Sequence, residues 1–271
     1  MTVPRILIIA GSDSGGGAGI QADIKTVTMF GGFAMTAVTA LTAQNTSGVQ
    51  DVLPVPGAFV AAQVQSVLDL GVDAVKIGML ATEEVATTVE TLLRFTFDDV
   101  PVVFDPVMVA TSGDALNENG TFEVLCRLAE LATVTTPNLP ELEALTGRTI
   151  GTVEALEEAA RELTDRSGRA TLAKGGHLEG DALTDILVQP DGQVRCWSDP
   201  RIETTSTHGT GCTLASAIAA GLGHGLALPE AVDQARRYVR AALQAAPGFG
   251  AGNGPLGHTL GVVPFDLAHP L

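Results

Sequence analysis

The sequence predicts an α/β fold, a three-layer doubly wound and mostly parallel sheet with helices on both faces. Short β-branched apolar runs alternate with segments whose apolar residues recur at helical spacing through most of the chain. Polar side chains follow several of the predicted strands at the point where each strand ends. Since the carboxyl ends of parallel strands share one edge of a sheet, we expect a ligand site along that edge.

The composition limits both the architecture and the partners. Hydrophobic residues make up 45% of the 271 residues and charged residues 17%, so one domain over residues 1–271 with a large core is expected. The net charge is −16, and Lys25, Lys76 and Lys174 are the only lysines. Nucleic acid and anionic membranes are not expected as partners because each needs a basic face. An anionic substrate would be held by backbone N–H groups, a metal ion or a few cations.

The cysteines and the apolar runs favour a cytoplasmic protein. Cys126, Cys196 and Cys212 are odd in number and lack metal-ligand spacing, which suits a reducing compartment. The first apolar run, over 6–10, is too short for the core of a signal peptide, and no run reaches membrane-spanning length.

The first predicted unit is a strand over 5–10, a glycine-rich loop over 11–19 and a helix over 20–30. Its glycine spacing does not fit the dinucleotide fingerprint, and no acidic residue closes a second strand about 20 residues later. Asp23, one turn into the helix, fits either a solvated acid favoured by the helix dipole or a ligand-binding group.

The predicted units that follow repeat this alternation. Gln44 follows a strand over 35–41, Asp105 follows a strand over 102–104, and Lys174 ends a strand over 170–174. The remaining elements are a short extended piece over 49–55, a strand over 73–77, helices over 59–68, 85–93, 153–163, 213–220 and 229–245, a loop and candidate lid over 110–120, and a β-hairpin over 185–197.

Two helix starts stand out for their polar groups. Asn138 and Glu141 are three apart across a predicted helix start, so both can face one side. In the segment 207–213 (THGTGCT), glycines precede an alanine-rich helix, whose first N–H groups could hold a phosphoryl group. An ordinary glycine turn before a helix is the alternative.

Seven segments together form a pattern that none of them carries alone. The segments are IAGSD (9–13) with GGAGIQAD (16–23), AQNT (43–46), KIGML (76–80), DPV (105–107), TPNLPE (136–141), KGGH (174–177) and THGTGCT (207–213). This pattern, which runs from about Ile6 to His258, closely resembles the hydroxymethylpyrimidine/phosphomethylpyrimidine kinases of thiamine biosynthesis, a branch of the ribokinase-like superfamily.

The resemblance implies a kinase that uses ATP and Mg²⁺. Such enzymes phosphorylate 4-amino-5-hydroxymethyl-2-methylpyrimidine and then its monophosphate, and family members are commonly homodimers. The resemblance also implies an anion hole from the N–H groups of Gly209, Thr210, Gly211 and Cys212.

The nucleotide would be held by Lys174, Asn138 and Glu141. Lys174 would be the counter-charge for the ATP phosphates, with a plain surface lysine as the alternative. Asn138 and Glu141 match a motif that organises Mg²⁺ and phosphate, and Asp105 is a further candidate oxygen ligand for the metal.

The pyrimidine would be held at the positions of Asp23 and Gln44, with Met79 and Val107 as apolar walls and Gly11 beside them. The Gln44 amide can donate to a ring nitrogen and accept from the 4-amino group, and Asp23 can accept a further N–H or O–H.

Cys212 occupies the position at which most of the superfamily carries an aspartate base. A thiol at a helix N-terminus has a lowered pKa and can serve as a base, whereas the alternative is a small residue that merely fits. For His208 we expect a packing or capping role, because the sequence assigns it no acidic partner. Cys126 and Cys196 are expected to be structural.

Two other functions remain open. The same pocket suits the substituted pyridine of a pyridoxine or pyridoxal kinase. A catalytically inactive pyrimidine-binding regulatory protein on the same fold would not need Asn138, Glu141 and Lys174.

Overall fold

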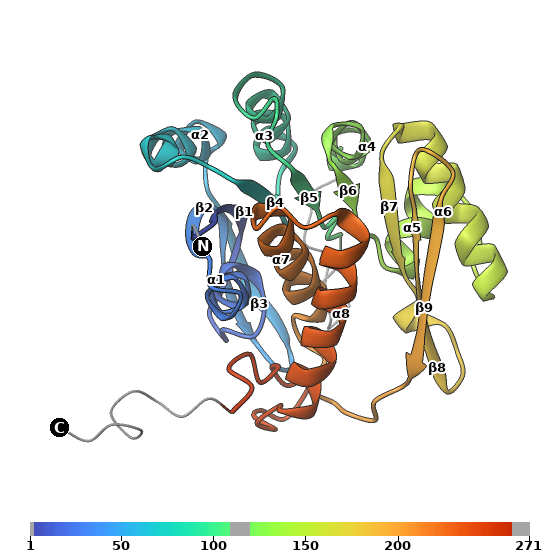
Figure 1. Cartoon of the computed structure of the whole chain (residues 1–271). Helices are drawn as coiled ribbons and strands as arrows, with labels where there is room; N and C mark the ends of the chain where they lie inside the picture. The colour runs from blue at the N-terminus through green and yellow to red at the C-terminus, as the bar shows by residue number, and fades with distance from the viewer. Residues whose placement is uncertain (1–2, 109–119, 262–271) are drawn as a thin grey trace.

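The computed structural model describes residues 3–108 and 120–261 (Figure 1). In this part of the chain nine strands form one sheet in the order β3-β2-β1-β4-β5-β6-β7-β8-β9. Strands β2, β1, β4, β5, β6 and β7 are parallel, while β3, β8 and β9 join antiparallel at the two edges. The strands are β1 (Arg5–Asp13), β2 (Phe33–Asn45), β3 (Gly48–Pro54), β4 (Ala74–Ile77), β5 (Val102–Phe104), β6 (Val134–Thr135), β7 (Ala170–Lys174), β8 (Ala182–Val188) and β9 (Val194–Pro200).

Helices cover both faces of the sheet, which confirms the three-layer, doubly wound prediction (Figure 1). One face carries α2 (Gly57–Val67), α3 (Glu83–Thr96), α4 (Thr121–Leu131), α5 (Leu139–Thr146) and α6 (Val153–Ser167), and the other carries α1 (Gly19–Met29), α7 (Thr210–Gly223) and α8 (Leu228–Gln244). Side chains along β1 point alternately to the two faces of the sheet. Leu7 and Ile9 pack on the face that carries α2 to α4, and Ile6 and Ile8 pack on the face that carries α1, α7 and α8.

The edges of the sheet extend the predicted elements. The hairpin expected over 185–197 is present as β8 and β9, with Val188 opposite Val194. The strand expected over 35–41 continues to Asn45, because β3 pairs with it antiparallel and completes its hydrogen bonds. The loop expected over 110–120 lies outside the described residues apart from Gly120.

A close backbone approach and a register shift shape the edge where the parallel strands end. Gly209, the residue before α7, has a φ of +86°, and a Cβ there would collide with the carbonyl oxygen of Gly17. In β1 the pairing register shifts between Ala10 and Ser12, around Gly11. The glycine loop after β1 and the turn before α7 therefore lie against each other.

None of the helices in residues 3–108 and 120–261 combines the length and apolarity that a bilayer span needs.

Candidate active site

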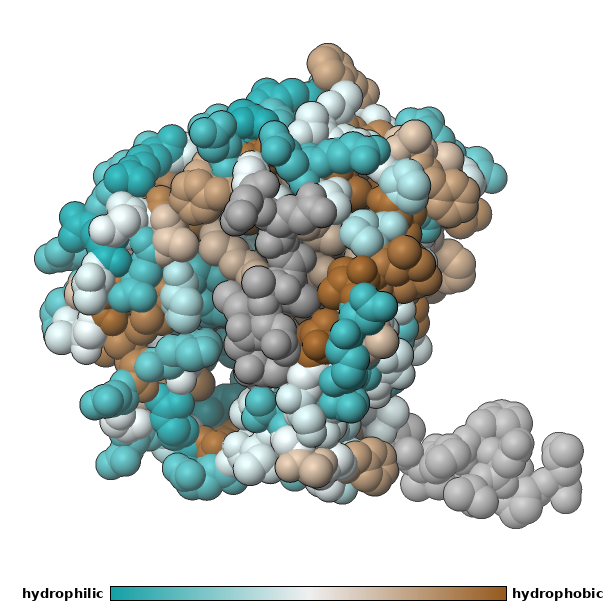
Figure 2. All heavy atoms as spheres, turned by 180° about the vertical axis from the view of Figure 1, so that it is seen from behind, coloured by the Kyte–Doolittle hydropathy of each residue, from teal (hydrophilic) through white to brown (hydrophobic). Residues whose placement is uncertain are grey.

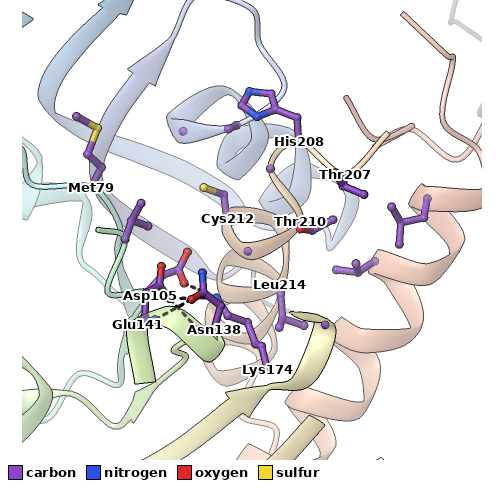
Figure 3. A pocket seen from close by; sticks show the side chains of 18 of the residues that line it. Met79, Asp105, Asn138, Glu141, Lys174, Thr207, His208, Thr210, Cys212 and Leu214 are labelled. Carbon is purple, nitrogen blue, oxygen red and sulfur yellow. Dashed lines mark hydrogen bonds and ion pairs between the residues drawn. The ribbon is translucent and has the colours of Figure 1, made fainter. Parts of the chain in front are cut away.

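A cavity of about 620 Å³ lies at the carboxyl ends of the parallel strands, beside the N-terminus of α7 (Figure 3). All of the predicted site residues except Asp23 line it. These are Gly11, Gln44, Met79, Asp105, Val107, Asn138, Glu141, Lys174, Gly209, Thr210, Gly211 and Cys212. The sheet topology thus brings together residues from the ends of the parallel strands and from the starts of α5 and α7, as the strand-end rule predicts.

The first turn of α7 is the cavity's potential anion-binding element. Its first N–H groups have no acceptor within the helix, and they carry the positive end of the helix dipole. A Cβ at Gly211 would lie 3.3 Å from Lys174 Nζ and from Asp105 Oδ2, so the helix start is close to both charged groups. This arrangement can hold a phosphoryl group between a helix terminus and an ammonium.

Lys174 is the centre of a buried cluster of opposite charges (Figure 3). Its Nζ lies 2.8 Å from Asp105 Oδ1 and 4.0 Å from Glu141 Oε2, and its side chain is 13% exposed. Burial acts to lower the pKa of Lys174, but Asp105 and Glu141 outweigh burial and raise it. The alternative of a plain surface lysine is therefore wrong, because its ammonium is held inside the cavity.

Asn138 and Glu141 form a capping box at the start of α5. Asn138 Oδ1 accepts the Glu141 N–H at 2.9 Å, and Glu141 Oε2 accepts the Asn138 N–H at 2.7 Å. Burial raises the pKa of Glu141 to about 7, Asp105 adds to this and Lys174 opposes it. The two residues do face one side of the helix start, as their spacing predicts.

The oxygen donors at this end fit a metal ion only in part. Within the described residues, no group of three or more His, Cys, Asp or Glu side chains is arranged to hold a metal. The Lys174 ammonium contacts Asp105 and approaches Glu141, and the Asn138 oxygen is engaged as a helix cap. The two carboxylates are hard donors of the kind that Mg²⁺ takes, so they fit a metal that is bound mainly by phosphate and water.

The structure corrects the interpretation of Asp23. Its side chain is fully buried rather than solvated, and it does not line the cavity. Lys76 Nζ lies 2.8 Å from one carboxylate oxygen, and Ser216 Oγ donates to the other at 2.7 Å. Because α1 packs against α7, the carboxylate lies behind the cavity wall with a partner on each of its two oxygens.

His208 has an acidic partner, contrary to expectation. Its Nε2 lies 2.9 Å from Asp13 Oδ2, and both residues are buried. Asp13 also accepts N–H groups from Gly15, Gly17 and Ala18. Burial acts to raise the pKa of Asp13, but His208 and the backbone donors lower it. The pair ties the glycine loop after β1 to the turn before α7, which agrees with a packing role for His208.

The expected lowering of the Cys212 pKa is also wrong for this structure. Burial raises the pKa of the thiol to about 11, with Lys76 opposing and Asp23 and Asp105 adding to the effect. The helix N-terminus favours the thiolate, but the loss of solvent outweighs it.

Sequence reasoning missed the far end of the cavity. Arg236, Val239, Arg240 and Leu243 line it from one face of α8, and Ile202 lies on the connection before α7. These four residues of α8 are spaced three and one apart, so they share one helix face, and this spacing could have indicated a cavity wall. A buried helix face in the core gives the same pattern.

An α/β fold with a helix terminus and a paired lysine at one cavity is the arrangement of a phosphotransferase. The chain belongs to the phosphomethylpyrimidine kinase family, whose model matches residues 13–257.

Relatives of known name agree with this family. The chain is 48% identical over 261 residues to the hydroxymethylpyrimidine/phosphomethylpyrimidine kinase of Streptomyces coelicolor, which covers 95% of each chain. It is 49% identical to the thiamine biosynthesis bifunctional protein ThiED of Geobacter sulfurreducens, and spans 52% of that protein's length. The pyridoxal kinase of Staphylococcus aureus in complex with AMP-PCP and pyridoxal matches with a TM-score of 0.87 at 30% identity, over 96% of this chain and 95% of the other. These likenesses confirm the ribokinase-like fold.

Proposed function

We propose that this protein transfers the γ-phosphoryl group of MgATP to 4-amino-5-hydroxymethyl-2-methylpyrimidine and then to its monophosphate, as part of thiamine biosynthesis. The observation that carries the proposal is a single cavity that contains an amide with apolar walls, a paired lysine and the start of α7. The name of the relative at 48% identity supports the hydroxymethylpyrimidine as acceptor, and the name of the relative at 49% identity supports thiamine biosynthesis.

The acceptor end is the part of the cavity around Gln44. Thr42 Oγ1 lies 3.2 Å from Gln44 Oε1 and 3.0 Å from the Ser12 carbonyl oxygen, and its one proton can be donated to either. Met79 and Val107 supply apolar walls, and the Met79 sulfur lies 3.0 Å from where a Cβ on Gly11 would be. An acceptor without ring nitrogen and amino group would leave the amide unpaired, so such analogues are disfavoured. Asp23 takes no part in this contact.

The phosphate end is the part of the cavity around Lys174. Phosphoryl transfer is catalysed mainly by positioning the reactants and neutralising charge on the transferred group. The N–H groups of Gly209, Thr210, Gly211 and Cys212 and the Lys174 ammonium would receive the phosphate oxygens. Asp105, Glu141 and Asn138 would hold Mg²⁺, which supplies further neutralising charge when bound. At the far end, the apolar side chains of Val239 and Leu243 on α8 suit the nucleotide base.

Cys212 is the proposed base for the acceptor hydroxyl, because it lines the cavity at the start of α7. The second transfer needs less help from a base, since its nucleophile is a phosphate oxygen that already carries charge. Cys212 as a small residue that fits remains the competing explanation.

The test of the function is ADP release from MgATP with three acceptors: the hydroxymethylpyrimidine, its monophosphate and pyridoxine. Turnover of both pyrimidines with little on pyridoxine is the expected result. Turnover of pyridoxine alone would show that the acceptor is a pyridine alcohol instead of the pyrimidine. The similarity to a pyridoxal kinase is the reason for including pyridoxine. No turnover with any acceptor would contradict the kinase and favour an inactive binding protein.

We also propose a cytoplasmic homodimer. Three free cysteines suit a reducing compartment.

The dimer is suggested by the surface. Hydrophobic patches interrupt a largely hydrophilic face of the molecule (Figure 2). On the edge strand β3 and its neighbour β2, Leu53 and Leu41 are 64% and 49% exposed. Light scattering of the purified chain tests the dimer, and a monomer mass at micromolar concentration would contradict it.

A further inference from the structure

Lys76 is a fully buried lysine to which the proposed reaction assigns no task. None of its side-chain surface is exposed, whereas Lys174 is 13% exposed. Taking an ammonium out of water costs several kcal/mol unless the charge is well paired. A leucine or methionine would fill a core position in β4 without that cost, so the charge itself calls for an explanation.

The position of Lys76 follows from the pleat of β4. Val75 and Ile77 pack in the layer that carries α2 to α4, so Ala74 and Lys76 point to the opposite face, toward α1 and α7. There the Lys76 ammonium meets Asp23 of α1 at 2.8 Å.

The ion pair lies directly behind the first turns of α7. Asp23 accepts the hydroxyl of Ser216, which is one helical turn beyond Cys212 on α7. Lys76 and Cys212 line the same cavity, although the side chain of Lys76 has no surface open to water. A ligand therefore cannot displace Asp23 from Lys76 without moving the wall, and the ammonium acts on the cavity only through its field.

The charges around this point are few and can be named. Asp23 comes from α1, Asp105 follows β5, and Cys212 comes from α7. Burial acts to lower the pKa of Lys76, but these three groups outweigh burial and raise it. In the opposite direction, Lys76 lowers the pKa of Cys212, against burial and the two carboxylates, and Lys174 at the open side of the cavity is a second cation coupled to the thiol.

We propose that Lys76 is a positioning residue for phosphoryl transfer, the fixed buried counter-charge that stabilises the Cys212 thiolate from behind the cavity wall. The inference rests on the proposed role of Cys212 as base. In that step the thiol proton has passed to water, and the thiolate then takes the proton of the acceptor hydroxyl. The acceptor oxygen forms its bond to the γ-phosphorus while the bond between that phosphorus and the bridging oxygen of ADP breaks.

The test compares Asp23→Asn with the double variant Asp23→Asn/Lys76→Met. The single variant keeps a hydrogen-bonding side chain beside Lys76 and leaves Asp105 as the carboxylate that favours its ammonium, and the double variant leaves no unpaired buried charge. Alkylation of Cys212 by iodoacetamide at pH 8 is followed by peptide mass spectrometry, with Cys196 as an exposed internal reference. The double variant is expected to react about tenfold more slowly than the single variant, with the Cys196 rate unchanged.

Turnover provides the second readout. The double variant should lose kcat on the alcohol relative to Asp23→Asn, with KM for both substrates unchanged and a smaller loss on the monophosphate. Equal alkylation rates in the two variants would overturn Lys76 as the counter-charge. Slower alkylation with unchanged turnover would overturn its part in the reaction together with Cys212 as base, while the kinase itself would stand. If the double variant fails to fold, Asp23→Asn alone decides: alkylation of Cys212 at the wild-type rate would show that the buried pair does not act on the thiol and would overturn the proposal.

Discussion

Two lysine–aspartate pairs lie at one cavity and have the same N–O distance, but only one of them is open to the cavity. Lys76 and Asp23 are 2.8 Å apart and both fully buried, and Lys174 and Asp105 are also 2.8 Å apart with 13% and 2% of their side chains exposed. Lys174 has a second carboxylate 4.0 Å away, whereas the second oxygen of Asp23 is taken by a serine hydroxyl. A pair that opens to the cavity can exchange its carboxylate for a phosphate, and a closed pair can only bias the charge of its neighbours.

The largest effect is expected at the open pair. Lys174→Met should lower kcat/KM for MgATP about 10³-fold, because it removes a donor that touches the transferred charge. Lys25→Met is the matched control, since Lys25 is exposed and its ammonium donates a hydrogen bond to the loop carbonyl of Gly16. Steady-state ADP release measures both variants. Similar activities in the two variants would show that Lys174 does not act on the nucleotide.

The next effect concerns the residue on which the closed pair acts. Cys212→Ser should lower kcat on the alcohol about 10²-fold and on the monophosphate by less, because only the alcohol must lose its proton. Separate initial rates with each acceptor provide the measurement. Normal rates on both acceptors would leave Cys212 as a residue that merely fits.

A third pair, His208 and Asp13, also lines the cavity and joins the glycine loop after β1 to the turn before α7. His208→Asn and Asp13→Asn should each lower kcat/KM about tenfold by loosening the glycine loop against the turn before α7. The double variant should lose no more than either single variant, because all three remove one connection. Additive losses in this cycle would mean that the two residues act independently.

The smallest effect comes from a buried group without a charged partner. Burial lowers the pKa of His258 to about 4, and Thr213 Oγ1 lies 3.0 Å from its ring. The unfolded chain takes up this proton below the ordinary pKa of 6.5, but the folded chain does not until about pH 4, so stability falls as the pH drops through this range.

Between pH 8 and pH 6 the histidine should therefore remove about 1 kcal/mol from the free energy of unfolding. Urea unfolding of the wild type and of His258→Gln at the two pH values measures this loss. An equal pH dependence in both proteins would rule out His258 as its source.

The sequence predicted the arrangement of the fold and most of the cavity lining, because both follow from local rules. Periodicity identified the strands and helices, and polar residues after strands identified Asp105, Asn138 and Lys174 as neighbours. The partners of Asp23 and His208 were not predictable in this way. They lie 53 and 195 residues away in the chain, and only the packing of α1 and α7 on the sheet brings them together.

The pKa of Cys212 illustrates the same limit. Its position at a helix N-terminus is visible in the sequence and favours the thiolate. The burial of its sulfur and the carboxylates of Asp23 and Asp105 come from separate elements, and they raise the pKa to about 11. The position at a helix start gives the sign of one contribution to the pKa of Cys212, whereas the sum of all contributions depends on how the elements pack.

The most direct test of the account follows the products of the hydroxymethylpyrimidine and MgATP over time by phosphorus NMR. One cavity that serves both transfers predicts that the monophosphate appears first and is then converted to the diphosphate, with two ADP formed for each pyrimidine consumed. An end point at the monophosphate, or no pyrimidine product from an enzyme that phosphorylates pyridoxine, would contradict it.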